Sequence, residues 1–155
     1  MMPRISQTSF NERNIGESQN STINVLALLS RLMKDWGRYT ESLSYDTKLY
    51  ELSLSKYGEQ DERVADAARQ LARTHYLSGK YQLAIGYYAQ NLTIRKLLYG
   101  DQHPQTAVAL NCLGMANKVL GNYEEGKQDC NLSNFLTINA DLVLILISLY
   151  SYKVL

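Results

Sequence analysis

The sequence has few residues that interrupt helices and few that can crosslink a chain. Proline occurs twice in 155 residues, as Pro3 and Pro104, and the two cysteines are Cys112 and Cys130. The middle of the chain is rich in Leu, Ala, Lys, Arg and Gln, and it lacks the runs of Val, Ile and Thr that favour strands. Two cysteines do not make a disulfide framework. We therefore expect a helical protein with reduced thiols, located in the cytoplasm.

An excess of charge of one sign is also lacking. Sixteen Lys and Arg face fifteen Asp and Glu, for a formal net charge of +1. Without a strong positive field we expect no nucleic-acid partner, and any recognition by charge must be local. One uninterrupted apolar run, residues 142–147, extends with Ser, Leu and Tyr to 152. It has about half of the ~20 residues that span a bilayer, so no membrane span is expected.

Residue patterns typical of catalytic and metal sites are missing from the sequence as well. The histidines His75 and His103 and the two cysteines are too scattered to form a metal-ligand set. There is no Gly-x-Ser-x-Gly motif and no glycine-rich phosphate loop. These absences predict a protein that is not an enzyme and uses no cofactor and no metal. We expect His75 to pack between hairpins, His103 to cap the helix that starts at Pro104, and Trp36 to pack beneath the turn at Gly37.

What the sequence does contain is a repeat of 42 residues. Gly37, Gly79 and Gly121 are separated by this interval, and each is followed two residues later by a tyrosine and preceded eight residues earlier by a leucine. The segments Lys56-Tyr57-Gly58 and Leu98-Tyr99-Gly100 have the same spacing. A period of this length is typical of a stack of similar supersecondary units. The equivalent leucines are Leu29, Leu71 and Leu113.

Each unit is predicted to be a hairpin of two helices. In the second unit, apolar residues recur at steps of three and four, the pattern of an amphipathic helix. Gly79 then ends this helix, because glycine tolerates a positive φ, and the next begins at Lys80-Tyr81. We expect Ser21 and Asp61 to cap the first helices of their units. The stripe consists of Val64, Ala67, Ala68, Leu71, Ala72 and His75.

These patterns predict an all-α fold, a right-handed superhelix of about three antiparallel helix hairpins. The expected organisation is a disordered polar leader at 1–20, repeats over 21–131 (21–58, 61–100 and 103–131) and an apolar C-terminal segment at 132–155. The repeat pattern weakens after Gln128, since Gly126, Cys130 and Asn134 replace larger apolar residues. Three interpretations of the segment remain: a helix that caps the open end, a surface that pairs with a partner or with itself, or a truncated end.

The second unit resembles the tetratricopeptide repeat, whose signature has the same residue types in the same order. The 42-residue period, and the segment Tyr99–Pro104 followed by Leu110–Gly114, are similar to the repeats of kinesin light chains and nephrocystin-3-like proteins. The resemblance covers residues 21 to 128 and implies an adaptor that binds a peptide or partner protein. The signature residues are Leu71, Ala72, Gly79, Tyr81, Ala84 and Tyr88.

The binding site can be located by counting from the repeat leucine. In a stack of hairpins the first helices line the inner surface, where positions two before, two after and five after the leucine are expected to face a groove. Five of these nine residues are basic. The candidate contacts are Arg31, Lys34, Arg69, Arg73, Tyr76, Asn111 and Lys118, with Ala27 and Met115 beside them.

Arg69 and Arg73 lie four residues apart on one helix face, where like charges repel unless an anion lies between them. Their guanidinium groups predict a groove for an extended acidic peptide, whose backbone Asn111 would hold. The alternative is a solvated charged face, neutralised by Glu62 and Asp66. A second function class is a truncated structural fragment of a longer repeat protein, acting only through association with other repeat proteins.

Overall fold

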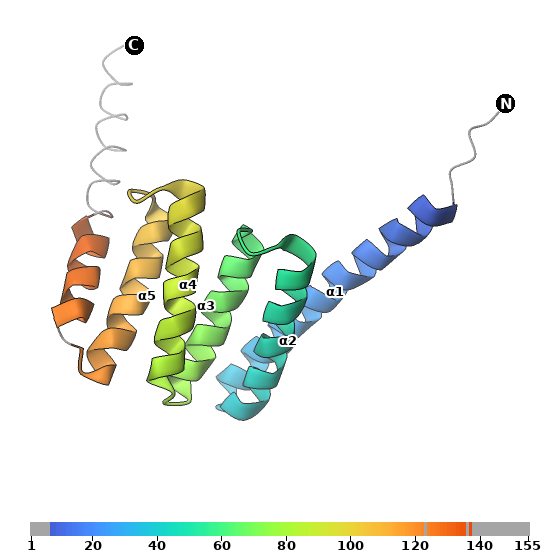
Figure 1. Ribbon diagram of the computed structural model, residues 1–155. Helices are drawn as coiled ribbons and strands as arrows, with labels where there is room; N and C mark the ends of the chain where they lie inside the picture. Colours follow the sequence, from blue (N-terminus) through green and yellow to red (C-terminus); the bar gives the residue numbers. More distant parts are fainter. Residues whose placement is uncertain (1–6, 123, 136, 138–155) are drawn as a thin grey trace, which may run out of the picture.

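The computed structural model describes residues 7–122, 124–135 and 137, with side chains from residue 18 onward. The helices stand side by side in chain order, alternate in direction, and each packs on the next (Figure 1). A further helical stretch at 124–135 follows them, and the described residues contain no strand. The predicted all-α array of helix hairpins is confirmed. The labelled helices are α1 (Gln7–Asp35), α2 (Tyr39–Tyr57), α3 (Glu62–Leu77), α4 (Tyr81–Tyr99) and α5 (Pro104–Leu120).

A glycine with positive φ follows each labelled helix. Their φ angles lie between 70° and 98°, and successive members of the series are 21 residues apart. A Cβ added at any of them would meet nothing within 4 Å, so the backbone conformation alone calls for glycine. The 42-residue repeat therefore consists of two helix-and-turn units of 21 residues. The series is Gly37, Gly58, Gly79, Gly100 and Gly121.

The starts of α3 and α5 agree with the sequence prediction. The side chain of Asp61 accepts a hydrogen bond from the backbone N–H of Arg63 at 2.8 Å. His103 Nδ1 accepts one from the backbone N–H of Gln105 at 3.1 Å, and Pro104 is the first residue of α5. Both predicted caps are confirmed, and each satisfies a backbone donor that the helix itself leaves free.

The start of α1 differs from the expectation. Residues 7–20, expected to be a disordered leader, are helical, and this part of α1 projects beyond α2 (Figure 1). Ser21 lies inside the helix, so its predicted capping role is wrong. The last turn of α2 reaches this part of the helix, where Lys56 Nζ and Tyr57 OH donate to Asn20 Oδ1 at 2.9 and 2.6 Å. Residues 1–6 of the expected leader lie outside the described residues.

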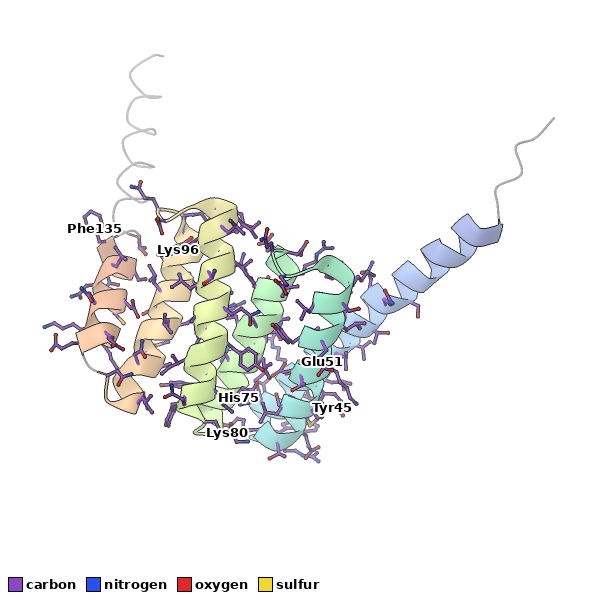
Figure 2. The ribbon with its side chains drawn as sticks, in the orientation of Figure 1. Tyr45, Glu51, His75, Lys80, Lys96 and Phe135 are labelled. Atoms are coloured by element: carbon purple, nitrogen blue, oxygen red, sulfur yellow. The ribbon has the colours of Figure 1, made fainter. Side chains whose placement is uncertain are left out.

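The interior is a thin layer between successive helices. Small residues let the helices approach closely, and larger rings fill the remaining space. His75 stacks on Tyr87 of α4 with ring centroids 5.6 Å apart, as its predicted packing role requires. Figure 2 shows His75 and Lys80 near the same end of the hairpin formed by α3 and α4. Burial lowers the pKa of His75, and the charge of Lys80 adds to the effect. Trp36 is 61% exposed, so the prediction that it packs beneath a turn is wrong.

The third hairpin continues farther than its sequence suggested. Its second helix runs through 124–135, past the expected end at 131. Buried Ser133 donates a hydrogen bond to the carbonyl of Ala107 at 2.7 Å. In the second hairpin, Asn91 Nδ2 donates to the carbonyl of Ala65 at 2.8 Å, and both residues of this bond lie 42 positions before those of the first. The same bond therefore ties the two helices of both hairpins. Residues 136 and 138–155, with most of the apolar segment, lie outside the described residues, and the interpretations of that segment stay predictions.

The cap of α3 gives a prediction about acid stability. The side-chain hydrogen bond from Arg63 holds the pKa of Asp61 at about 2, below its ordinary value of 3.8. A lowered pKa contributes stability that is present above the ordinary value and is lost as pH falls through the folded value. Asp61→Asn keeps a capping oxygen and removes the charge. We expect this variant to be less stable than the parent protein near neutral pH, by under about 1 kcal/mol because the pair is exposed.

The difference should disappear between about pH 4 and about pH 2, and denaturant unfolding across this range measures it. A difference that stays constant over the whole range would show that the carboxylate charge contributes no stability.

Candidate functional site

A groove of about 710 Å³ lies between α1 and α3, the first helices of two successive hairpins. Four cationic side chains line it, and one carboxylate, Asp35. Its size falls within the usual range of ligand pockets, roughly 300–1,000 Å³. The lining residues are Asn24, Ala27, Leu28, Arg31, Lys34, Asp35, Arg69, Gln70 and Arg73.

The structure brings together four of the seven residues predicted to bind a partner: Arg31, Lys34, Arg69 and Arg73 all line the groove. The other three lie elsewhere. Tyr76 is half-buried and packs edge-on against Tyr81, with ring centroids 5.3 Å apart. Asn111 and Lys118 are exposed on α5, outside the groove lining.

The groove cations differ in their pairing. Lys34 Nζ lies 3.0 Å from Asp46 Oδ2, in an ion pair beneath the groove. Arg69 has one long contact, 3.4 Å, with Asp66 Oδ1. Among the described side chains, Arg31 and Arg73 have neither a hydrogen bond nor an ion pair. Two guanidinium groups of the groove are therefore available to an incoming anion.

The acidic residues that could neutralise the groove arginines are held by another cation. Arg95 of α4 is 3% exposed, and its guanidinium donates to Glu62 at 2.8 Å and to Asp66 at 2.7 Å. The hydrogen bond from Arg95 lowers the pKa of Glu62. Asp66 is shared, because its contact with Arg69 is the longer one. The two carboxylates therefore mainly neutralise Arg95. They do not neutralise Arg69 and Arg73 to the extent that the alternative of a solvated charged face expected.

The second buried charge, Asp46 of α2, lies at the centre of what we call the Asp46 cluster: Ser30, Ser42, Asp46 and Thr74, all at most 1% exposed. Asp46 accepts hydrogen bonds from the hydroxyls of Ser30 and Thr74 and a longer one, 3.4 Å, from Ser42. The cluster therefore joins α1, α2 and α3. It also fixes the ammonium group of Lys34 at the groove.

The Asp46 cluster has an apolar counterpart one repeat later. Each of its four residues lies 42 positions before a member of a hydrophobic cluster, so Asp46 corresponds to Tyr88. One register position is thus filled by a buried carboxylate in the first hairpin and by an aromatic ring in the second. Burial raises the pKa of Tyr88 well above its usual range. The apolar counterpart consists of Ala72, Ala84, Tyr88 and Ala116.

Sequence reasoning missed Asp46 and Arg95. A signal for Asp46 was present, because three hydroxyl residues and one carboxylate replace three alanines and a tyrosine in the repeat register. Arg95 corresponds to Ser53 in the preceding unit, and no repeated feature marks it. Within the described residues no three His, Cys, Asp or Glu side chains are grouped to hold a metal, and no helix has the length and apolar character of a membrane span.

The sequence matches the model of one known protein family. The tetratricopeptide repeat model matches residues 21–96 and 63–125, which together are more than half of the chain. The chain belongs to the tetratricopeptide repeat family. The groove is thus formed by the first helices of two adjacent tetratricopeptide repeats. A search of curated protein sequences gives no significant match.

Solved structures share the tetratricopeptide fold at low identity. BtubC (BKLC) from P. vanneervenii is 22% identical with a TM-score of 0.70, over 76% of this chain and 46% of that one. A putative kinesin light chain from Podosopora anserina with nearly identical TPR-like repeats is 15% identical with a TM-score of 0.71, over 76% of this chain and 56% of that one. The tetratricopeptide domain of Arabidopsis FLU is 18% identical, with a TM-score of 0.65, over 80% and 98%.

The chain spans about half the length of the first two structures, and the likeness at these identities shows the fold. The predicted resemblance to kinesin light chain repeats is confirmed.

The Asp46 cluster gives a stability prediction for this repeat array. Asp46→Ala leaves Lys34 without its carboxylate and two buried hydroxyls without their acceptor, so we expect a loss of roughly 3 kcal/mol in the free energy of unfolding. Copying the apolar counterpart, with Asp46→Tyr, Ser30→Ala, Ser42→Ala and Thr74→Ala together, should recover most of that loss.

Denaturant unfolding of both variants measures the two free energies. A fourfold variant as unstable as Asp46→Ala would show that the two clusters are not interchangeable.

Proposed function

We propose that this tetratricopeptide array is an adaptor that binds an acidic peptide segment of a partner protein in the groove between α1 and α3. The observation that carries the proposal is the pair of unpaired guanidinium groups, Arg31 on α1 and Arg73 on α3, in one groove. Free Cys112 and Cys130 are compatible with the cytoplasmic location that we infer for the protein.

Recognition in this groove relies on shape, charge and hydrogen bonds and needs no bond chemistry. Planar guanidinium groups bind carboxylates through two parallel N–H···O bonds, a geometry that Lys does not offer. Asn24 and Gln70 line the same groove and supply amide groups for a peptide backbone. The exposed side chain of Leu28 offers an apolar contact beside them. Together these groups suit a segment in which carboxylates alternate with small or apolar residues.

The three predicted contact residues that lie outside the groove would bind a longer peptide. Tyr76 lies in the last turn of α3, and Asn111 and Lys118 lie on α5, the first helix of the next repeat. A peptide that runs on along the first helices would reach them after leaving the arginines. A short peptide is expected to depend on the α1–α3 groove alone.

Charge reversal tests the groove directly. We expect Arg69→Glu with Arg73→Glu to raise the Kd for a fluorescein-labelled peptide rich in Asp and Glu by at least about tenfold, because each reversal replaces an attraction by a repulsion. Fluorescence anisotropy with the full chain measures the Kd. Moderate salt should weaken binding to the parent protein as well, since the groove is open to solvent.

The matched control reverses two exposed lysines outside the groove, Lys48 on α2 and Lys127 on the helix at 124–135. Lys48→Glu with Lys127→Glu changes the net charge by the same amount and should leave the Kd within about twofold. Equal losses in the two double variants would mean that overall charge, and not the groove, attracts the peptide.

A further inference from the structure

Two apolar residues of α1, Val25 and Leu32, are exposed although their repeat equivalents are buried. They lie seven residues apart and so share a helix face, which Trp36 extends four residues after Leu32, just past the end of α1. The three side chains are 40–61% exposed. Such a contiguous face on a first helix normally lies against a neighbouring element. We call Val25, Leu32 and Trp36 the α1 stripe.

The equivalent positions in α3 and α5 show what kind of element belongs on this face. Val25 corresponds to Ala67 and Ala109, which are 2% and 1% exposed. Leu32 corresponds to Thr74 and Ala116, both 0% exposed. Thr74 is covered by Asp46 of α2, and Ala116 packs with Ala84 and Tyr88 of α4. The covering element is therefore the second helix of the preceding hairpin.

The sequence ahead of the α1 stripe carries the features of an inter-hairpin turn. Gly16 lies 21 residues before Gly37, so in the sequence it continues the spacing of the five glycines that have a positive φ. Ile15-Gly16-Glu17 takes the register of Tyr57-Gly58-Glu59 and Tyr99-Gly100-Asp101. In the structure, however, Gly16 lies within the continuous helix α1. Glycine is a poor residue for a helix interior and a suitable one for a turn with positive φ.

A second feature of that turn is also repeated. The hydroxyl of Thr106 donates to the carbonyl of Gly100 at 2.7 Å and so closes the turn before α5. Thr22 takes the register of Thr106 and lies six residues after Gly16, the same separation as in the α5 turn. In the continuous helix this hydroxyl instead donates to the carbonyl of Ser18 at 2.9 Å. Both the glycine and the closing hydroxyl of a turn are therefore present at 16–22.

We propose that α1 breaks at Gly16 in a second, more stable conformation, in which residues 7–15 pack back on the α1 stripe as the second helix of a preceding hairpin. The occupant of the stripe is thus a segment of this same chain. Phe10 takes the register of Leu52 and of Ile94, which is 5% exposed. The break also brings the start of α1 to the register at which α3 and α5 begin, close to residues 19–20.

Replacing Gly16 distinguishes the two conformations by the sign of the effect. Gly16→Ala should lower the Tm of the full chain by about 2 °C or more if residue 16 needs a positive φ, and should raise it if the helix is continuous. Two controls fix these signs. Gly58→Ala replaces a turn glycine with φ 80° and lowers the Tm, whereas Gly86→Ala replaces a glycine inside α4, with open space around the new Cβ, and raises it. Far-UV circular dichroism on heating measures all three.

A second pair of variants tests the covered stripe. Val25→Glu should lower the Tm, because the proposal places residue 25 in a contact equivalent to those that bury Ala67 and Ala109. The control is Val108→Glu on α5, where the valine is 50% exposed and the Tm should stay within about 1 °C. The proposal is overturned if Gly16→Ala raises the Tm as Gly86→Ala does, or if Val25→Glu is as neutral as Val108→Glu.

Discussion

The backbone turn at a glycine every 21 residues is the constraint on which the rest of this fold depends. A positive φ follows each helix at this interval, so α2 to α5 have similar lengths, 16 to 19 residues, and return at a constant offset. Side chains 42 positions apart therefore meet equivalent neighbours. The recurring bond from Asn91 and from Ser133 to a first-helix carbonyl follows from this constancy, although the two residues differ in type.

A constant backbone offset leaves open what fills each equivalent space. The second hairpin uses Tyr88 among small residues, and the first uses Asp46 among hydroxyls. A buried carboxylate is costly unless its hydrogen bonds are complete, and here hydroxyls and Lys34 provide them. The buried carboxylate of the first hairpin also binds a side chain at the surface, which the ring of Tyr88 does not do. That side chain is Lys34 of α1, which lies in the register of Tyr76 in the second hairpin.

The features that could be predicted from the sequence depend on near neighbours. The turn at Gly79, the caps at Asp61 and His103 and the stripe of α3 each need only a few adjacent residues, and the structure has them all. The Asp46 cluster joins residues 16 and 28 positions apart, and Arg95 finds its carboxylates 29 and 33 positions earlier. Such partners are defined by helix packing. The repeat register could therefore predict a basic groove but not which of its cations are paired.

That pairing determines the charge that the groove presents. Arg95 of α4 pairs with Glu62 and Asp66 of α3, its partner helix in the same hairpin, and these are the carboxylates nearest in sequence to Arg69 and Arg73. Asp46 has the opposite effect, because it neutralises Lys34 from below. Buried residues on the second helices thus decide which cations on the first helices stay free. A substitution at the buried position 46 or 95 would therefore redistribute the charge of the groove without changing any residue that lines it.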